Sequence, residues 1–203
     1  MDQNFTRSVL SWYDAGHRDL PWRRTKDAYR IWVSEIMLQQ TRAETVVSYY
    51  ERFLARYPDV RALADAPEEE LLKAWEGLGY YSRARLLQKA ARAIVSQYGG
   101  ELPADLKKLR ALPGVGDYTS GAIASIAFGI PAAAVDGNVE RVICRYFAIS
   151  EEMGSPKSRR MIHELAQSLV PPDRPGAFAN AMMEMGATMC TPKSPSCGTS
   201  TSR

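Results

Sequence analysis

The chain has 203 residues, of which 45% are hydrophobic and 24% are charged, a composition typical of soluble globular proteins. Its net charge of +3 is too small to establish a nucleic-acid partner by itself. The sequence lacks an apolar run of about 18 residues, and its first residues do not combine a basic segment with an apolar one, so we expect neither a membrane span nor a secretory signal.

Amphipathic segments separated by glycine, proline or polar breaks follow one another from the N-terminus. A proline-restricted turn is expected at 18–23, and a short helical piece at 59–65. Longer helices are predicted over residues 5–16, 29–40, 42–57, 67–77, 82–100, 102–112, 117–129, 138–148, 155–169 and 176–189. Because no segment alternates polar and apolar residues as a strand would, we predict an all-helical fold.

The segment VSEIMLQQT, residues 33–41, places one acid inside an apolar run. A helix through this segment puts Ile31, Trp32 and Leu38 on the same face as Glu35. A carboxylate among apolar side chains is costly to ionise, so Glu35 is a candidate proton donor. The alternative is an ordinary acid on the surface of a helix.

The segment LRALPGVGDYTSGAIASIA, residues 109–127, carries a leucine-bearing helix into a tight turn and a second helix. Gly114 and Gly116 permit a turn that side chains would block. Their bare backbone N–H groups near the start of the next helix suit a phosphate oxygen. The alternative is a plain connection between two helices.

The segment VDGNVERV, residues 135–142, precedes and begins another apolar-patterned helix. Asp and Asn both favour the N-cap position, and we expect Asn138 to be the cap of this helix. Asp136 is two residues too early for that position, so we expect its charge to point into a cleft near the positive end of the helix.

The hairpin LPGVGDYT followed by VDGNVERV resembles the helix-hairpin-helix DNA glycosylase superfamily. Members that act as lyases carry a lysine nucleophile at the second position after the last glycine of the hairpin, where this chain has Tyr118. The resemblance therefore implies a monofunctional glycosylase that forms no Schiff base.

The motifs HRDLPWR, SEIMLQQT, WEGLGYYSRAR and CTPKSPSC together resemble the adenine DNA glycosylase (MutY) family across almost the whole chain. The resemblance implies a two-lobed helical fold with its active site in the groove between the lobes. Residues 26–132 would form a six-helix barrel lobe that contains the hairpin 109–127, and residues 1–25 with 133–203 would form the second lobe. The implied partner is double-stranded DNA with mispaired adenine, bound by a cytoplasmic monomer that acts at the bacterial nucleoid.

The resemblance implies four catalytic positions. Glu35 would donate a proton to N7 of adenine, and Asp136 would stabilise the positively charged sugar. Tyr118 and Asn138 would position Asp136 and the sugar. The target adenine must leave the base stack before any of these groups can reach its glycosidic bond.

Other family positions are expected to contact DNA or the adenine. Gln40 and Tyr80 would fill the duplex where the base has left. The full set of expected DNA contacts is Gln40, Tyr80, Leu38, Gly114, Val115, Gly116 and Arg83, although a solvated helix face is the alternative for Arg83. The expected base pocket consists of Arg18, Leu20, Trp22, Arg23 and Asn180, and Trp22 has the alternative of strapping the N-terminal segment to the core.

The sequence departs from the family at three places. Relatives hold a [4Fe–4S] cluster with four cysteines, of which this chain has Cys190 and Cys197 and carries Ser200 at the third position. We therefore expect no cluster and no other cofactor, with the two cysteines as remnants of the ligand set. The family domain that reads 8-oxoguanine has no counterpart in these residues, and Asn180 replaces a longer Glu or Gln.

Three functions remain open from the sequence. The first is excision of adenine opposite 8-oxoguanine or guanine. The second is a thymine mismatch glycosylase, which Glu35 disfavours because thymine has no N7 to protonate. The third is a degenerate DNA-binding module without catalysis.

Overall fold

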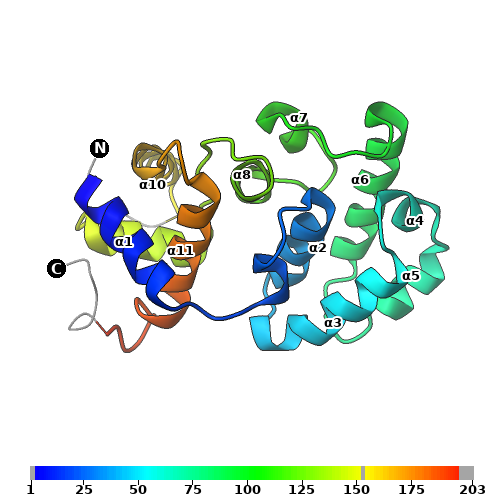
Figure 1. The fold of residues 1–203 in the computed structure, drawn as a ribbon, viewed down its shortest axis with the longest axis horizontal. Helices are drawn as coiled ribbons and strands as arrows, with labels where there is room; N and C mark the ends of the chain where they lie inside the picture. Colours follow the sequence, from blue (N-terminus) through cyan, green and yellow to red (C-terminus); the bar gives the residue numbers. More distant parts are fainter. Residues whose placement is uncertain (1–2, 152–153, 197–203) are drawn as a thin grey trace. The chain divides into compact units, whose positions relative to one another are not determined.

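A computed structural model describes residues 3–151 and 154–196, and every regular element in those two ranges is a helix (Figure 1). The all-helical prediction is confirmed for this part of the chain. The elements are α1 (Gln3–Ala15), the 3₁₀ helix η1 (Pro21–Arg23), α2 (Ala28–Leu38), α3 (Ala43–Arg56), α4 (Val60–Asp65), α5 (Glu68–Ala74), α6 (Ser82–Tyr98), α7 (Leu106–Arg110), α8 (Asp117–Ile126), α9 (Gly137–Tyr146), α10 (Pro156–Leu169) and α11 (Pro175–Thr188).

Helix ends follow local chemistry that the sequence shows. Gly99 closes α6 in the left-handed conformation, with φ of 68°, which is typical of a glycine at the end of a helix. The helix predicted over 102–112 is shorter than expected and begins only at Leu106. The Asp105 carboxylate accepts a hydrogen bond from the backbone N–H of Lys108 at 2.9 Å, which fixes the start of α7 after Pro103.

The chain forms two compact units. One consists of Met1–Asp19 with Ala124–Arg203, and the other consists of Leu20–Ile123. The predicted lobes, 26–132 and its complement, have different boundaries. The second observed boundary falls inside α8, so a helix that looks continuous in the sequence contributes residues to both units.

The unit Leu20–Ile123 is built around α6, which packs against α4, α5 and α2, while α2 also packs against α3 (Figure 1). Its centre contains large side chains that are less than 2% exposed, among them Trp32, Met37 and Leu63. Trp75 and Phe53 meet edge to face there, with ring centroids 5.9 Å apart. Burial of these side chains holds α2, and with it the catalytic candidate on that helix, in a fixed position.

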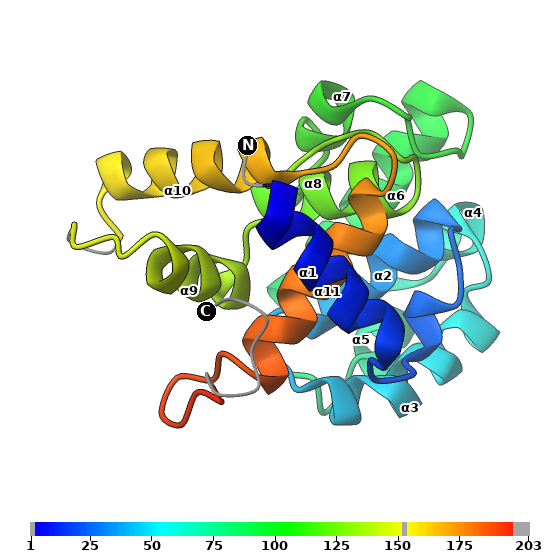
Figure 2. The same cartoon turned by 60° about the vertical axis from the view of Figure 1, so that its left-hand side comes forward.

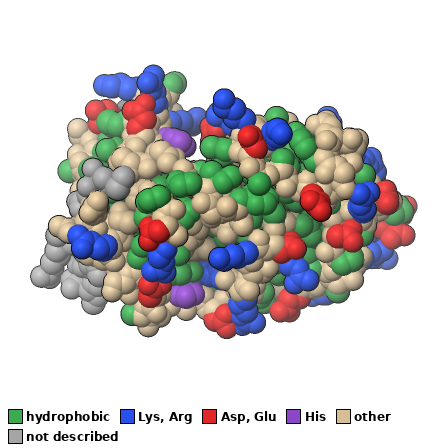
Figure 3. Space-filling view, turned by 45° about the horizontal axis from the view of Figure 1, so that its top comes forward, with side chains coloured by type: hydrophobic (Ala, Val, Ile, Leu, Met, Phe, Trp, Pro, Cys, Tyr) green, Lys and Arg blue, Asp and Glu red, His purple; other side chains and the backbone are tan. Residues whose placement is uncertain are grey.

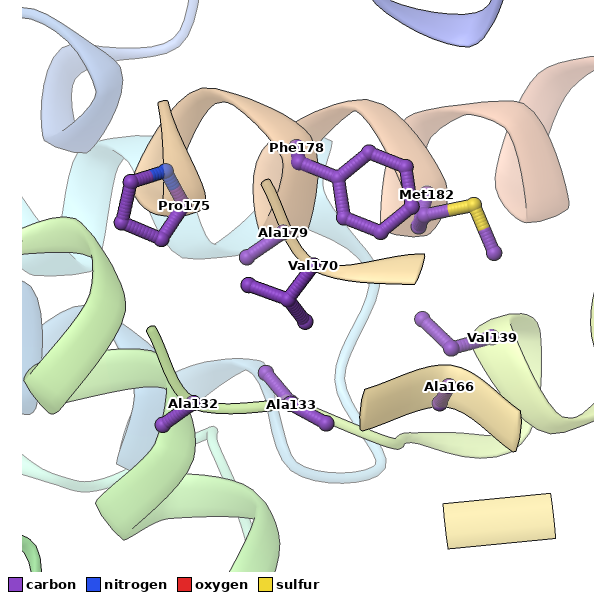
Figure 4. A pocket seen from close by; sticks show the side chains of 10 residues that line it. Ala132, Ala133, Val139, Ala166, Val170, Pro175, Phe178, Ala179 and Met182 are labelled. Carbon is purple, nitrogen blue, oxygen red and sulfur yellow. The ribbon is translucent and has the colours of Figure 1, made fainter. Parts of the chain in front are cut away.

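In the other unit, α11 packs against α1 and α9, and α10 packs against α9 (Figure 2). Its core joins Phe5 and Val9 of α1 to Ile143 of α9 and Met185 of α11. A small apolar cavity lies between α9, α10, α11 and residues 132–134 (Figure 4). Its volume of about 10 Å³ is room for about one water molecule, so it cannot hold a purine base.

The surface is mixed in charge. Acidic and basic side chains are interspersed on the face that Figure 3 shows, in keeping with the small net charge of +3. Among the described residues, no helix is long and apolar enough to cross a membrane.

Candidate active site and nucleic-acid interface

Glu35 is a buried acid. It lies on α2 and is 3% exposed, so the alternative of a surface acid is wrong. Most of α2 is buried, and Ile31, Trp32 and Ile36 are among its buried residues together with Glu35. Burial disfavours the charged form of a carboxyl group, and the apolar run in the sequence predicted this burial.

Tyr118 contacts Glu35. The Tyr118 hydroxyl donates a short hydrogen bond to Glu35 Oε2, from the first turn of α8 to α2. The role that the family resemblance implies for Tyr118, positioning Asp136 and the sugar, stays a prediction beside this contact with Glu35. The hairpin therefore does more than connect two helices, because it delivers a hydroxyl to the buried acid.

Asp136 is the N-cap of α9. Its Oδ1 accepts hydrogen bonds from the backbone N–H groups of Asn138 at 3.0 Å and Val139 at 2.8 Å. The expectation that Asn138 would be the cap is wrong, because the helix begins at Gly137, one residue earlier than expected. The carboxylate thus lies at the positive end of α9, where the helix dipole favours a negative charge.

Asn138 supports Asp136 from one side, and Arg141 supports Asn138. The Asn138 side-chain amide donates to Asp136 Oδ2 at 2.8 Å, a contact that agrees with the role implied for Asn138. Arg141 Nη2 donates to Asn138 Oδ1 at 2.8 Å and to the carbonyl of Gly186 at 2.6 Å. Arg141 was not among the residues expected from the sequence. Its position three residues after Asn138 on the same helix could have indicated that the two side chains are neighbours.

Arg18 is bound to a buried acid. Its Nε and Nη2 donate to the two carboxylate oxygens of Glu184 at 2.9 and 2.8 Å, and its backbone N–H donates to Oε1 at 3.2 Å. Glu184 is 2% exposed and was also absent from the expected site. The signal was available, because Glu184 interrupts the apolar run AMMEMG of α11 as Glu35 interrupts that of α2.

The other expected pocket residues differ in exposure. Leu20 and Trp22 are buried, and the Trp22 ring packs edge to face on Tyr50 with centroids 5.5 Å apart. This packing agrees with the alternative for Trp22, in which its side chain fixes the N-terminal segment to the core. Arg23 on η1 and Asn180 on α11 are half-buried.

The hairpin between α7 and α8 presents backbone rather than side chains. Of the three hairpin residues expected to contact DNA, Gly114 and Gly116 are exposed and Val115 is buried. Gly114 has φ of 73°, and a Cβ atom there would lie 2.8 Å from Cβ of Leu86. Gly114 is therefore required by two separate constraints.

Gln40 and Tyr80 lie in strained turns. Both have positive φ, 59° and 47°, which few residues other than glycine adopt. Gln40 is exposed, Tyr80 is 63% exposed, and Leu38 is half-buried. Gln39, to which the sequence assigns no role, directs its amide toward Thr119 Oγ1 at 3.4 Å. Strain of this kind is concentrated at functional positions in proteins, which agrees with a DNA contact by Gln40 and Tyr80.

Arg83 is not exposed. Its residue surface is 9% accessible, and its guanidinium donates to backbone carbonyls near Gln40 and Tyr80. The solvated alternative is therefore wrong, and the expected phosphate contact stays a prediction that this burial does not favour. The spacing of basic residues after GYYS did not distinguish a buried arginine from exposed ones such as Arg85.

The cysteines of the described residues do not form a metal site. Cys190 follows α11, and its Sγ accepts a hydrogen bond from Arg145 Nη1 at 3.3 Å, while Cys197 lies outside the described residues. No group of three or more His, Cys, Asp or Glu side chains in residues 3–151 and 154–196 could hold a metal ion. A [4Fe–4S] cluster takes four ligands, so the described residues do not fit one. The absence of a cluster stays a prediction.

A family model described as the HhH-GPD superfamily base excision DNA repair protein matches residues 33–172. The chain belongs to this superfamily. The matched range includes α2 with Glu35, the hairpin with Tyr118, and α9 with Asp136. Membership confirms the helix-hairpin-helix fold that the sequence resemblance implied.

Curated relatives carry the name adenine DNA glycosylase. The human protein is 50% identical over 95% of this chain, and the Buchnera aphidicola (Acyrthosiphon pisum strain) protein is 37% identical over 95%. This chain spans 37% of the length of the human relative and 55% of that of the Buchnera one.

Solved structures of similar fold cover nearly the whole chain. A thermostable thymine-DNA glycosylase is 36% identical with a TM-score of 0.89, covering 97% of this chain and 90% of its own. A trapped endonuclease III–DNA covalent intermediate is 25% identical with a TM-score of 0.80, covering 96% and 89%.

Proposed function

We propose that this chain is a monofunctional DNA glycosylase that flips mispaired adenine, opposite 8-oxoguanine or guanine, out of the duplex and hydrolyses its glycosidic bond. The buried Glu35 carboxyl group in contact with the Tyr118 hydroxyl is the observation that carries this proposal. The names of the relatives, adenine DNA glycosylase at up to 51% identity, support the choice of base.

Glu35 supplies the proton in this mechanism. Adenine is a poor anionic leaving group, and a proton on N7 lets it depart as a neutral base. Glu35 is 3% exposed, and such burial favours the protonated, neutral form of a carboxyl group. As the glycosidic bond breaks, its electron pair goes to adenine and the sugar becomes cationic.

Asp136 stabilises that cation. Its carboxylate is held by two backbone N–H groups and the Asn138 amide, so it is oriented before the reaction begins. Water then adds to the sugar carbon and returns a proton to the carboxylate that gave one up. Tyr118, which stands where lyases carry lysine, offers no amine for a Schiff base.

Double-stranded DNA is the proposed partner of the protein, which we expect to act as a monomer in the cytoplasm. The exposed glycine backbone of the hairpin suits a phosphate, and Gln40 and Tyr80 suit the space that a flipped base leaves. The endonuclease III relatives of known structure were solved with DNA, which supports this assignment.

The test uses labelled duplexes that carry A opposite 8-oxoguanine, A opposite guanine, or T opposite guanine, each treated with alkali after incubation with the protein. We expect strand scission at adenine only. Glu35→Gln should reduce the rate roughly 100-fold or more while duplex binding persists, because a general acid contributes about that factor. Glu101→Gln, an exposed acid, is the matched control and should retain the wild-type rate.

The similarity to the thymine-DNA glycosylase gives the second candidate function, because that structure is covered almost end to end by this chain. Scission at thymine only would establish it in place of adenine excision. Binding without scission at either base would identify a non-catalytic module. Full activity of the Glu35→Gln variant would contradict the mechanism proposed for Glu35.

A further inference from the structure

Arg83 lies in the first turn of α6, and its guanidinium bonds to the two turns that hold Gln40 and Tyr80. We call residues 39–41 the Gln40 turn and residues 78–80 the Tyr80 turn. The Gln40 turn follows the C-terminus of α2, and the Tyr80 turn precedes α6. The two turns are therefore far apart in the sequence. In the unit Leu20–Ile123, Gln40 and Tyr80 are the non-glycine residues with positive φ in the described structure.

The guanidinium of Arg83 bonds to the α2 side through Nη1. This nitrogen donates to the carbonyls of Ile36 at 2.9 Å and Met37 at 3.1 Å, and also to that of Gln39. These carbonyls belong to the end of α2, where the helix itself provides no partner. Nη2 lies 3.4 Å from Thr41 Oγ1, a further contact with the Gln40 turn.

The same guanidinium bonds to the other turn through Nη2. It donates to the carbonyls of Leu78 at 2.8 Å and Gly79 at 3.3 Å. Its central carbon lies 5.7 Å from the Tyr80 ring centroid and 5.5 Å from that of Trp75, within the range of cation–π attraction. The Trp75 indole N–H in turn donates to the Gly79 carbonyl at 3.1 Å.

Burial gives these contacts their importance. Desolvation lowers the pKa of Arg83 from its ordinary value, and the convergent carbonyl oxygens compensate the buried charge. A planar guanidinium can donate in opposite directions at once, whereas the donors of a lysine radiate from one atom. The site therefore requires arginine, because the positive charge of a lysine would not supply donors in both directions.

We propose that Arg83 is a positioning residue that couples the Gln40 turn to the Tyr80 turn, so that the two strained residues meet DNA as one preformed unit. This inference rests on the proposed function for its role with DNA. The coupling itself is a property of the free protein and can be measured without DNA.

The first experiment measures amide hydrogen exchange of the free protein at both turns. We expect Arg83→Lys to raise exchange in residues 39–41 and 78–81 together, by at least about tenfold, because opening either turn then no longer requires breaking shared hydrogen bonds. Arg85→Lys is the matched control on the same helix, since Arg85 is exposed and pairs with Glu68 at 2.8 Å. An increase in one turn alone, or in neither, would overturn the coupling.

A second variant keeps this test valid if Arg83→Lys does not fold. Tyr80→Ala leaves Arg83 in place and removes the ring beside its guanidinium. Coupling predicts faster exchange in residues 39–41 as well as in 78–81. A change confined to 78–81 would contradict it.

The second experiment measures affinity for a duplex with adenine opposite 8-oxoguanine. We expect Arg83→Lys to weaken binding about tenfold, and to add less than twofold when combined with Gln40→Ala and Tyr80→Ala, because Arg83 acts through those two residues. A merely structural residue would weaken the double variant by the same factor as the wild type, and that result would overturn the positioning role. If the wild type binds no adenine mismatch, the proposed function fails, while the exchange measurements still decide the coupling.

Discussion

Asp136 combines two effects that substitution can separate. Its carboxylate caps α9 through hydrogen bonds from the N–H groups of Asn138 and Val139, and it provides the negative charge proposed to face the sugar cation. Asparagine is also a good N-cap but carries no charge. The structural and chemical contributions of this residue are therefore distinguishable.

We predict that Asp136→Asn keeps the free energy of unfolding within about 0.5 kcal/mol of wild type, since a cap remains. Its excision rate should fall roughly 100-fold or more, because the electrostatic stabilisation is lost. Asp136→Ala should lose the activity and also about 1 kcal/mol of stability. Urea unfolding and single-turnover excision measure the two quantities.

The matched control for this prediction is Asp59→Ala. Asp59 caps α4 by accepting from Ala62 N–H at 2.9 Å, and it is exposed. Asp59→Ala should lower the free energy of unfolding about as much as Asp136→Ala does, while the excision rate stays at the wild-type value. If Asp136→Asn proved as active as wild type, the charge would have no part in the reaction.

The α7–α8 hairpin contains two glycines under different constraints. Gly114 has positive φ and sits against Leu86, whereas Gly116 does not have positive φ and a Cβ atom added there would meet nothing within 4 Å. A shared GxG pattern in the sequence therefore hides two separate requirements. Substitution by alanine tests them one at a time.

We predict that Gly114→Ala lowers the free energy of unfolding by about 1–3 kcal/mol, from backbone strain and the contact with Leu86. Gly116→Ala should leave stability within about 0.5 kcal/mol and still weaken DNA binding, because its methyl group blocks approach of a phosphate. Thermal unfolding and a salt titration of affinity check both. Wild-type affinity of Gly116→Ala would show that DNA does not approach this backbone.

Two arginines of α9 bond to the residues that follow α11. Arg141 Nε donates to the Cys190 carbonyl at 2.6 Å, and Arg145 Nη1 donates to the Thr191 carbonyl at 2.8 Å. These bonds attach the residues after α11 to α9. Hydrogen bonds within the protein are therefore one means of attachment of this segment.

We predict that the purified protein lacks the absorbance near roughly 400 nm that iron–sulfur proteins show, and that a chelator leaves its melting temperature unchanged. Arg145→Ala should instead lower the melting temperature, because the bonds to residues 190–192 are lost. Iron analysis of the protein provides the independent check. Bound iron whose removal unfolds the protein would contradict this prediction.

Local sequence patterns predicted the helices well and the long-range contacts poorly. The apolar run around Glu35 indicated burial, and α2 is indeed buried. The Tyr118 contact with Glu35 spans 83 residues of chain, and the Arg83 bonds to the end of α2 span more than 40. Periodicity and spacing carry no information about such pairs, because they depend on how helices pack.

The same limit explains the displaced boundary and the missed cap. The division between the units falls inside α8, which the hydrophobic pattern shows as one continuous helix. Asp136 and Asn138 are both favourable caps, so two residues of helix length decided between them. Glu184 was overlooked although it shows the same signal as Glu35, an acid inside an apolar helix.

Two buried tyrosines make the free energy of unfolding depend on pH in the alkaline range. Tyr50 is 3% exposed, and burial raises its pKa to about 12, with the charge of Asp27 adding to the shift and that of Arg30 opposing it. Burial raises the pKa of Tyr29 still further, and its hydroxyl donates to the Tyr57 carbonyl at 2.7 Å. Below about pH 10 both hydroxyls are protonated in the folded and in the unfolded chain, so their contribution is fully present there.

Above about pH 10 the unfolded chain releases these protons while the folded chain retains them, so the free energy of unfolding must fall as pH rises toward about 12. Each tyrosine contributes a slope of about 1.4 kcal/mol per pH unit in this window. We predict that Tyr50→Phe removes one such slope in urea titrations between about pH 9 and 11.5, whereas Tyr98→Phe, which leaves both buried hydroxyls in place, does not. Equal slopes in wild type and Tyr50→Phe would show that Tyr50 ionises as readily in the folded protein as in the unfolded chain.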